Sequence, residues 1–162
     1  MSALTIQIHA IAEADRDWVR QVYGSWGADF IVTRGRKVFA DDTEGLYAAG
    51  PDGRRVGLLT YEIIGDQCEV ITLDAFEKFH GIGTALMEQV AEVAGDRGCK
   101  RLWLITTNDN LDAIRFYHRR GFVIAAVHVN SLEHSRSLKP TIPLVGCYGI
   151  PLRDEIEFEM WL

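Results

Sequence analysis

The spacing of apolar residues changes within the first quarter of the chain. Apolar and polar residues alternate over residues 4–11 with the two-residue period of a β-strand. Over residues 14–26 the apolar residues, beginning with Trp18, recur at the three- to four-residue spacing of a helix. The sequence therefore predicts a strand followed by an amphipathic helix. Residues 30–42 follow neither period clearly, and we assign no element to them.

The middle of the chain carries three strand patterns in succession. They cover residues 46–49, 56–64 and 68–75. The turn sequence Gly-Pro-Asp-Gly at residues 50–53 separates the first two, and a Gly-Asp pair at residues 65–66 separates the second and third. Turns this short join antiparallel strands, so the sequence predicts an antiparallel meander.

After the meander the pattern alternates between helix and strand. The predicted elements are a helix over residues 83–97, a strand over 101–107, a helix over 110–120, a strand over 122–130 and a last strand through Ile156, Phe158 and Met160. Because a strand, a helix and a strand follow one another, we expect the strands at 101–107 and 122–130 to pair in parallel through the crossover helix. Residues 131–154 contain three prolines and are predicted to be rich in loops.

Length and composition predict one globular domain. The chain has 162 residues, of which 48% are hydrophobic and 25% charged, which is too hydrophobic for a disordered chain and too charged for a membrane bundle. We therefore expect residues 1–162 to form a single α/β domain.

Charge and cysteine content narrow the class of protein further. The formal net charge of −6 argues against a protein that binds nucleic acid through bulk electrostatics, and it is compatible with a cationic substrate such as an amine. The three cysteines, Cys68, Cys99 and Cys147, are odd in number and far apart, which fits a reducing compartment. The chain begins with no signal sequence and contains no apolar run long enough to span a membrane. We expect a soluble cytoplasmic protein that contacts neither membrane nor nucleic acid.

A glycine-containing junction follows the third strand of the meander. There the segment at residues 78–83, Lys-Phe-His-Gly-Ile-Gly, leads into a helix. Glycines let the backbone approach a ligand closely, and the free N–H groups of a first helical turn attract phosphate. A dinucleotide-binding fingerprint would need Gly or Ala where Leu86 stands, and the P-loop sequence is absent. A plain strand-to-helix turn is the alternative at this junction.

Two motifs in this half of the chain resemble those of the GNAT superfamily of N-acetyltransferases. The first is the glycine segment at residues 78–83, and the second is the segment Asn-Leu-Asp-Ala-Ile-Arg-Phe-Tyr-His-Arg-Arg-Gly-Phe at residues 110–122. The sequence departs from the family pattern at Lys78, where Gln or Arg is usual, and at Phe79, where many members have Gly. Neither change removes a backbone N–H donor.

The resemblance implies an α/β fold with a central twisted mixed sheet flanked by helices, and a cleft for acetyl-CoA between the strands at 68–75 and 101–107. The pantetheine arm would pair with the backbone near Thr72 and Leu73, and the pyrophosphate would meet the glycine segment. Asn110 would reach the co-substrate or cap its helix. The residues expected to bind the co-substrate are Thr72, Leu73, Lys78, Phe79, His80, Gly81, Ile82, Gly83, Thr84 and Asn110.

Acetyl transfer to an amine needs a neutral nucleophile and a stabilised thiolate. By resemblance, Tyr117 would donate a hydrogen bond or a proton to the CoA sulfur; the alternative is a core aromatic residue. Glu69 shares a strand face with Ile71 and Leu73 if the two-residue period holds, and it is the candidate base. Glu62 and Asp74 compete with Glu69, and some relatives need no single base. The five histidines show no metal-ligand spacing, so we expect no metal.

The sequence thus predicts an acetyl-CoA-dependent N-acetyltransferase that uses a primary amine, from a small molecule or a peptide, in a ternary complex. Two alternatives stay open: a CoA-binding sensor without turnover, and an acyltransferase with a different acyl-CoA. The acidic residues at 154–159 could face a cationic amine, but the solvent side of an edge strand is the expected role. Trp26, Trp161 and the last strand offer surfaces through which a homodimer could form.

Overall fold

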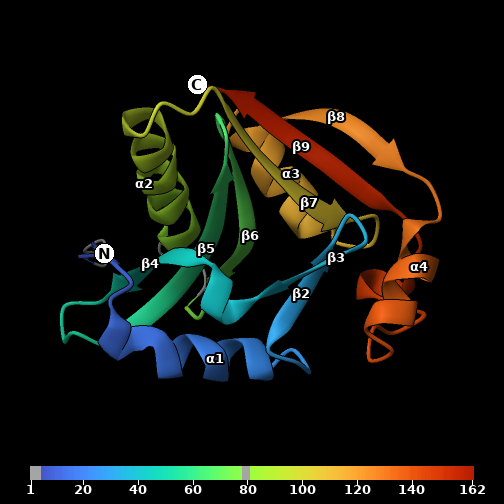
Figure 1. Cartoon of the computed structure of the whole chain (residues 1–162), viewed down its shortest axis with the longest axis horizontal. Helices are drawn as coiled ribbons and strands as arrows, with labels where there is room; N and C mark the ends of the chain where they lie inside the picture. Colours follow the sequence, from blue (N-terminus) through green and yellow to red (C-terminus); the bar gives the residue numbers. More distant parts are fainter. Residues whose placement is uncertain (1–4, 78–80) are drawn as a thin grey trace.

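The computed structural model describes residues 5–77 and 81–162 and contains a seven-stranded sheet of order β1-β4-β5-β6-β7-β9-β8 (Figure 1). Its strands are β1 (Gln7–Ala10), β4 (Glu44–Ala49), β5 (Arg55–Ile64), β6 (Gln67–Ala75), β7 (Arg101–Thr107), β8 (Val123–His128) and β9 (Glu155–Trp161). β6 and β7 pair in parallel, and every other neighbouring pair is antiparallel. The predicted meander is present as β4, β5 and β6, and the mixed sheet is as expected.

Helices and a small hairpin surround the sheet (Figure 1). The α-helices are α1 (Arg16–Gly24), α2 (Ile82–Asp96), α3 (Leu111–Arg119) and α4 (Ser131–Leu138), the 3-10 helices are η1 (Glu13–Asp15), η2 (Ala40–Asp42) and η3 (Cys147–Gly149), and the hairpin consists of β2 (Phe30–Thr33) and β3 (Arg36–Phe39). None of the helices in the described ranges is long and apolar enough to cross a membrane.

Each face of the sheet has its own core. Leu86 and Val90 of α2 pack with Leu59 of β5 and Leu104 of β7 in the larger cluster, which Ile114 of α3 also contacts. On the opposite face, a smaller cluster is formed by Val19, Tyr23, Ala40 and Leu58 from α1, η2 and β5. Burying both faces stabilises the central strands and fixes the ends of the helices against them.

The structure assigns the two stretches that the sequence pattern left without an element. Residues 30–42 contain the β2–β3 hairpin, whose turn residues Arg34 and Gly35 both have positive φ, 50° and 74°. Arg34 lacks the Gly or Asn signal that marks such turns, so the hairpin was hard to predict. Within the segment expected to be loops, Ser131–Leu138 forms α4. This helix is short and mostly polar, and Leu132 is its one buried aliphatic residue, so its pattern is weak.

The predicted direct pairing of β7 with β8 is wrong. β9 lies between them and pairs antiparallel with both, from Arg101↔Trp161 to Thr107↔Glu155 on one side and over Val123–His128 on the other. β7 and β8 are still parallel, as the crossover through α3 requires, but they are second neighbours. The last strand is therefore inside the sheet, and β8 forms its edge.

This position of β9 also corrects the expectation for its acidic residues. Glu157 and Glu159 both accept hydrogen bonds from Arg101 of β7, at 2.6 Å each, and Glu155 is 2% exposed. None of the three lies on the solvent side of an edge strand. Trp26 is half-buried against Tyr23, so of the two tryptophans only Trp161, 66% exposed, presents a large free surface.

Candidate active site

The parallel pair β6–β7 opens into a gap halfway along its length. Its ladder runs from Gln67↔Arg101 to Val70↔Leu104 and goes no further, although both strands continue. At this point β6 contains a bulge, because Thr60 of β5 pairs with Thr72 while the next residue, Tyr61, pairs with Val70. A bulge bends the strand that carries the extra residue. The strands then diverge toward α1 and the β2–β3 hairpin (Figure 1).

The gap leaves one backbone edge of β6 open. Beyond Val70, the strand is still paired with β5 through Thr72 and Leu73, but its other edge has left β7. The bulge also breaks the expected alternation of side chains. The Thr72 hydroxyl bonds to Thr60 at 2.6 Å on the α1 side, whereas Leu73 packs into the α2 core. Glu69 and Leu73 therefore lie on opposite faces of the sheet. The two-residue period had predicted one shared face, and the bulge is the reason for the difference.

A cavity of about 520 Å³ continues from this gap. Its walls come from the diverging strands, from β2 and the segment before it, from the N-terminus of α3, from α4, and from the loop before β9 together with the first residue of that strand. The lining residues are Trp26, Ile31, Val32, Thr33, Val70, Ile71, Ile105, Thr106, Thr107, Asn110, Leu132, Ser135, Lys139, Ile142, Leu152 and Glu155. Nine of these sixteen residues are apolar and seven are polar or charged, a mixture that suits a small molecule with both apolar and polar groups.

The glycine junction begins α2 at the same end of the sheet. Gly81 precedes the helix in a left-handed conformation with φ 72° and accepts the first helical hydrogen bond, from Ala85, at 3.0 Å. A left-handed residue is the ordinary place for glycine. Lys78, Phe79 and His80 lie outside the described residues, so their expected contact with the co-substrate stays a prediction.

Residues from α3 pack against the first turn of α2. The Phe116 ring would lie 3.3 Å from a Cβ built on Gly83, so glycine permits the close approach of the two helices. Arg120 donates from Nε to the Thr84 hydroxyl at 2.8 Å, and its guanidinium lies over the Phe116 ring. This arginine brings a positive charge to the helix N-terminus. The sequence motif included Arg120, but nothing in its spacing marked it for this position.

Glu69 is 3% exposed and lies in a polar cluster between β6 and the hairpin. Its Oε1 accepts from the Thr33 hydroxyl at 2.7 Å, and its Oε2 accepts from Arg36 at 3.1 Å. Burial raises the pKa of Glu69 above its ordinary value, and the bonds from Thr33 and Arg36 partly oppose that rise. Glu69 does not line the cavity itself, but Thr33 does.

The competing carboxylates are arranged differently. Glu62 accepts from the other guanidinium nitrogen of Arg36 at 3.0 Å and makes no bond to Thr33. Asp74 is half-buried at the end of β6, where desolvation raises its pKa. Glu69 is therefore the one of the three that is connected to the cavity by a hydroxyl group.

Tyr117 lies on α3 among aromatic rings. Its ring is 5.5 Å from Phe116, 5.9 Å from Phe122 and 5.7 Å from Phe158, measured between centroids. Burial raises the pKa of Tyr117 to about 12, so the hydroxyl keeps its proton at neutral pH. The ring thus packs against the core, and its protonated hydroxyl is suited to donate a hydrogen bond.

The turn between β7 and α3 supports one wall of the cavity. Asn110 caps α3, since its Oδ1 accepts from the N–H of Ala113 at 3.3 Å, and it also lines the cavity. The buried Asp109 carboxylate accepts from the Thr107 hydroxyl at 2.5 Å and from the N–H of Cys147 at 2.8 Å. This second bond fastens the loop before β9 to the turn.

The cavity wall contains two buried charged residues. Lys139 was not a candidate from the sequence, whereas Glu155 is one of the acidic residues at 154–159 that could face a cationic amine. Lys139, directly after α4, is 7% exposed, and its Nζ donates to the carbonyl of Phe30 at 3.2 Å. Glu155 accepts from the N–H of Arg34 at 3.2 Å, and its Oε1 lies 3.6 Å from the Arg34 guanidinium. Their burial depends on α4 and on the central position of β9, neither of which the sequence pattern predicted.

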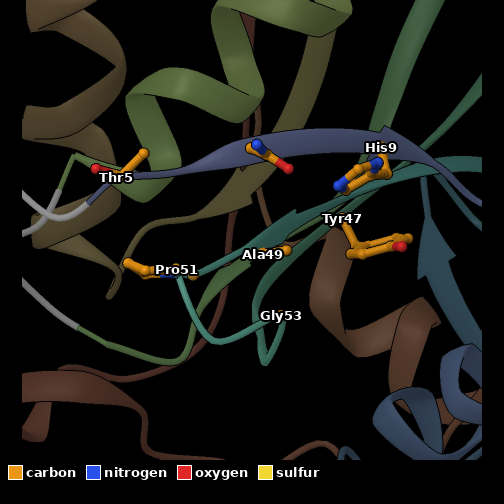
Figure 2. A pocket seen from close by; sticks show the side chains of 8 residues that line it. Thr5, His9, Tyr47, Ala49, Pro51 and Gly53 are labelled. Atoms are coloured by element: carbon orange, nitrogen blue, oxygen red, sulfur yellow. The ribbon is translucent and has the colours of Figure 1, made fainter.

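A second, smaller hollow lies at the opposite edge of the sheet. It measures about 270 Å³ and is lined from β1, β4 and the turn at residues 50–53. Figure 2 shows His9 and Tyr47 side by side on neighbouring strands, and their rings stack with centroids 5.1 Å apart. Among the described residues that line it, His9 and Tyr47 are the titratable ones. Within the described ranges, no cluster of His, Cys, Asp or Glu could hold a metal ion in this hollow or elsewhere.

Comparison with known proteins places this architecture in a family. The model of the acetyltransferase (GNAT) family matches residues 9–122. The uncharacterized protein YdhI of Bacillus subtilis is 45% identical over 133 residues, which cover 82% of this chain and 83% of the relative. Among solved structures, the IAA acetyltransferase from Bacillus cereus superposes with a TM-score of 0.73 at 19% identity, covering 98% of this chain and all of the other. A GNAT acetyltransferase from Elizabethkingia anophelis with acetyl-CoA bound gives a TM-score of 0.71 at 20% identity, covering 97% of this chain and 98% of that one.

The chain therefore belongs to the acetyltransferase (GNAT) family. The predicted fold and the predicted enzyme class, an N-acetyltransferase with acetyl-CoA as co-substrate, are confirmed.

Proposed function

We propose that this protein transfers the acetyl group of acetyl-CoA directly to a primary amine, with both substrates bound together. The observation that carries the proposal is the opening of β6 from β7 beside the first turn of α2, with a cavity leading away from the gap. The open edge of β6 suits the pantetheine arm of the co-substrate, and the N-terminus of α2 suits its pyrophosphate. The cavity leaves room for a second, smaller substrate.

Backbone groups would bind most of the co-substrate. The amide-rich pantetheine arm pairs with the free edge of β6 near Thr72 and Leu73, as another strand would. The pyrophosphate lies against the N–H groups at residues 81–84, where the helix dipole favours negative charge. Arg120, at the C-terminus of α3, donates to the Thr84 hydroxyl and so adds a cation beside this turn.

The reaction exchanges one bond to the acetyl carbon for another. The neutral amine attacks the thioester carbonyl, a C–N bond forms, the C–S bond breaks, and the amine loses one proton. Tyr117 donates a hydrogen bond or its proton to the departing sulfur. Glu69 receives the amine proton through the Thr33 hydroxyl, which lines the cavity and donates to the carboxylate.

Calorimetric titration with acetyl-CoA, with CoA, NAD and ATP as controls, tests the binding step first. We expect acetyl-CoA and CoA to bind and NAD and ATP not to bind. Absence of acetyl-CoA binding would contradict the proposal.

Initial velocities of CoA release then test the chemistry, with both substrates varied over a panel of primary amines. Intersecting double-reciprocal lines are expected for a ternary complex, whereas parallel lines would indicate an acetyl-enzyme and contradict direct transfer. Binding without turnover of any amine would favour a CoA-binding module of the same fold. Faster turnover with succinyl-CoA or a longer acyl-CoA would identify a different acyl group.

A further inference from the structure

The cavity wall contains a buried ammonium group with no carboxylate partner. Lys139 lines the cavity from the end of α4, and it is 7% exposed. Among the described residues, no carboxylate oxygen lies within 4 Å of its Nζ. Its one hydrogen bond goes to the carbonyl of Phe30, 3.2 Å away, and its Nζ lies 5.6 Å from the centroid of the Phe30 ring. An ammonium carries three donors, so this bond leaves capacity for an acceptor.

Burial of an unpaired charge is unfavourable, and proteins usually neutralise it with a partner. Desolvation accordingly lowers the pKa of Lys139 below its ordinary value. A bound anion would supply the missing partner and restore that pKa. Glu155 also lines the cavity: its Oε2 accepts from the N–H of Arg34, and its buried Oε1, which lies 3.6 Å from the Arg34 guanidinium, has no hydrogen-bond partner among the described residues.

The other side chains of the cavity wall indicate which kind of ligand fits there. Between the gap and α4, the cavity is bounded by the side chains of Trp26, Ile31, Ile142 and Leu152. These are apolar groups of medium to large size, and they favour an aliphatic or aromatic body over a highly charged one. A polyamine with several ammonium groups would place a positive charge against Lys139, which is unfavourable.

We propose that the acceptor is an amino acid, or another small primary amine that carries a carboxylate. Its carboxylate pairs with Lys139, and its apolar side chain lies against Trp26 and Ile31. This inference rests on the proposed function, because it names the amine that the enzyme acetylates. The amine then points toward the β6–β7 gap, where the thioester is expected. Lys139 is a specificity-determining residue in this arrangement and takes no part in the chemistry.

Matched acceptors that differ only in the carboxylate test this pairing. CoA release is measured with L-leucine and L-leucinamide, and with L-phenylalanine and L-phenylalaninamide, for the wild type and for Lys139→Met. Methionine replaces the apolar stem of lysine with an unbranched side chain of similar length but removes the ammonium group and its charge. The ratio of kcat/KM for acid over amide is compared between the two proteins, so that the different basicities of the two amines cancel.

We expect the acid-to-amide ratio to fall by about 10- to 100-fold in Lys139→Met, the range expected for one lost charge-assisted hydrogen bond. Activity on the amides should stay within about threefold of wild type, and Lys139→Arg should retain most of the preference. Lys37→Met is the matched control. Lys37 is exposed and its Nζ also lies over the Phe30 ring, at 4.6 Å, but it does not line the cavity, so the ratio should not change.

A purely structural Lys139 would give a different result. Its bond to Phe30 fastens α4 to β2, so Lys139→Met could lower the melting temperature and all activities equally. An unchanged acid-to-amide ratio would overturn the inference, as would turnover restricted to amines without a carboxylate. Failure to acetylate any amine would instead refute the proposed function, and the inference would fall with it.

Discussion

The Tyr117 hydroxyl belongs to a ring that is otherwise packed among Phe116, Phe122 and Phe158. Because burial keeps its proton in place at neutral pH, its expected contribution is a hydrogen bond to the sulfur that develops negative charge. Tyr117→Phe keeps the ring and removes only that group. The substitution thus separates the role of the hydroxyl from that of the packing.

We expect Tyr117→Phe to lower kcat by about 10²- to 10³-fold and to leave the dissociation constant of acetyl-CoA nearly unchanged. Steady-state kinetics and calorimetry on the same preparation check both quantities. Phe116→Leu is a useful control, because it disturbs the neighbouring ring without touching the hydroxyl. A full-rate Tyr117→Phe enzyme would show that the tyrosine is a core residue only.

If Glu69 is the base, kcat/KM should depend on the ionisation of its carboxyl group. The carboxyl must be ionised to accept a proton, and its pKa is raised, so kcat/KM should fall as the pH drops through a value above the ordinary 4.5. Glu69→Gln should cost about 10²-fold near neutral pH and abolish this acidic limb. Thr33→Val, which removes the connecting hydroxyl, should reduce the rate in the same direction.

Two neighbouring glutamates make this assignment testable. Glu62→Gln removes the other ion pair of Arg36, but Glu62 makes no hydrogen bond to Thr33. This variant should therefore keep the acidic limb of the pH profile. If Glu155→Gln removes the limb while Glu69→Gln retains it, then Glu155 is the base. The pH profile therefore distinguishes catalysis from a mere loss of the ion pair with Arg36.

At the scale of elements, one glycine fixes the distance between α2 and the sheet. A Cβ at Gly57 of β5 would lie 2.5 Å from Cγ2 of Ile82 and 3.1 Å from the carbonyl oxygen of Asp74. The first turn of α2 is therefore seated directly on the sheet, where it lies beside the β6–β7 gap. Any residue larger than glycine must push that turn away.

Gly57→Ala should destabilise the protein by about 1–3 kcal/mol and weaken acetyl-CoA binding, because overpacking displaces the helix end that binds the pyrophosphate. Gly95→Ala, in the same helix, is its matched control. A Cβ there meets nothing within 4 Å, so that change should be neutral or stabilising by up to about 1 kcal/mol. Denaturant unfolding and calorimetry measure the two effects, and equal behaviour of both variants would contradict the prediction.

Most of the elements follow from local patterns, and the exceptions have physical reasons. The meander and α2 have clear periods, and the two segments that resemble family motifs contain Gly81 and Tyr117. The position of β9 could not be read locally, because an alternating strand is compatible with an edge or with the middle of a sheet. The bulge opposite Thr60, which sets the faces of Glu69 and Leu73, likewise has no glycine or proline to signal it.

The cavity residues depend on contacts between distant parts of the chain. Lys139 lies 109 positions from its partner Phe30, and Glu155 lies 121 positions from its partner Arg34. No pattern within a short window contains that information. For this reason the sequence motifs predict residues for the co-substrate side of the site, whereas Lys139 on the proposed acceptor side became a candidate only from the structure.

At the scale of the whole molecule, the loop before β9 must be held against the body of the domain. Asp109 does this from a buried position, 3% exposed, by accepting from the N–H of Cys147. A Cβ on Gly146 would collide with the Asp109 carboxylate, so the loop follows the turn closely. The side chain of Leu152, which lines the cavity, also approaches Gly146.

Asp109→Ala should raise the KM for the amine several-fold while the affinity for acetyl-CoA changes little, because only the acceptor wall loses its support. Asp112→Ala is the control, since Asp112 accepts a hydrogen bond from Tyr148 of the same loop at an exposed site. Kinetics with each substrate varied in turn provide the check. An equal loss of affinity for the amine and for acetyl-CoA would indicate general unfolding.

The place of β9 between β7 and β8 has a consequence for how the chain folds. All other strands precede β9 in the sequence, so during synthesis β7 and β8 emerge before the strand that must join them. Until then β8 has no partner in the sheet, and Glu155 cannot complete the cavity wall. Such long-range pairing is slow to form and leaves strand edges exposed to association. The enzyme can therefore become active only after its final strand has entered the sheet, and the nascent chain is most prone to aggregation just before that step.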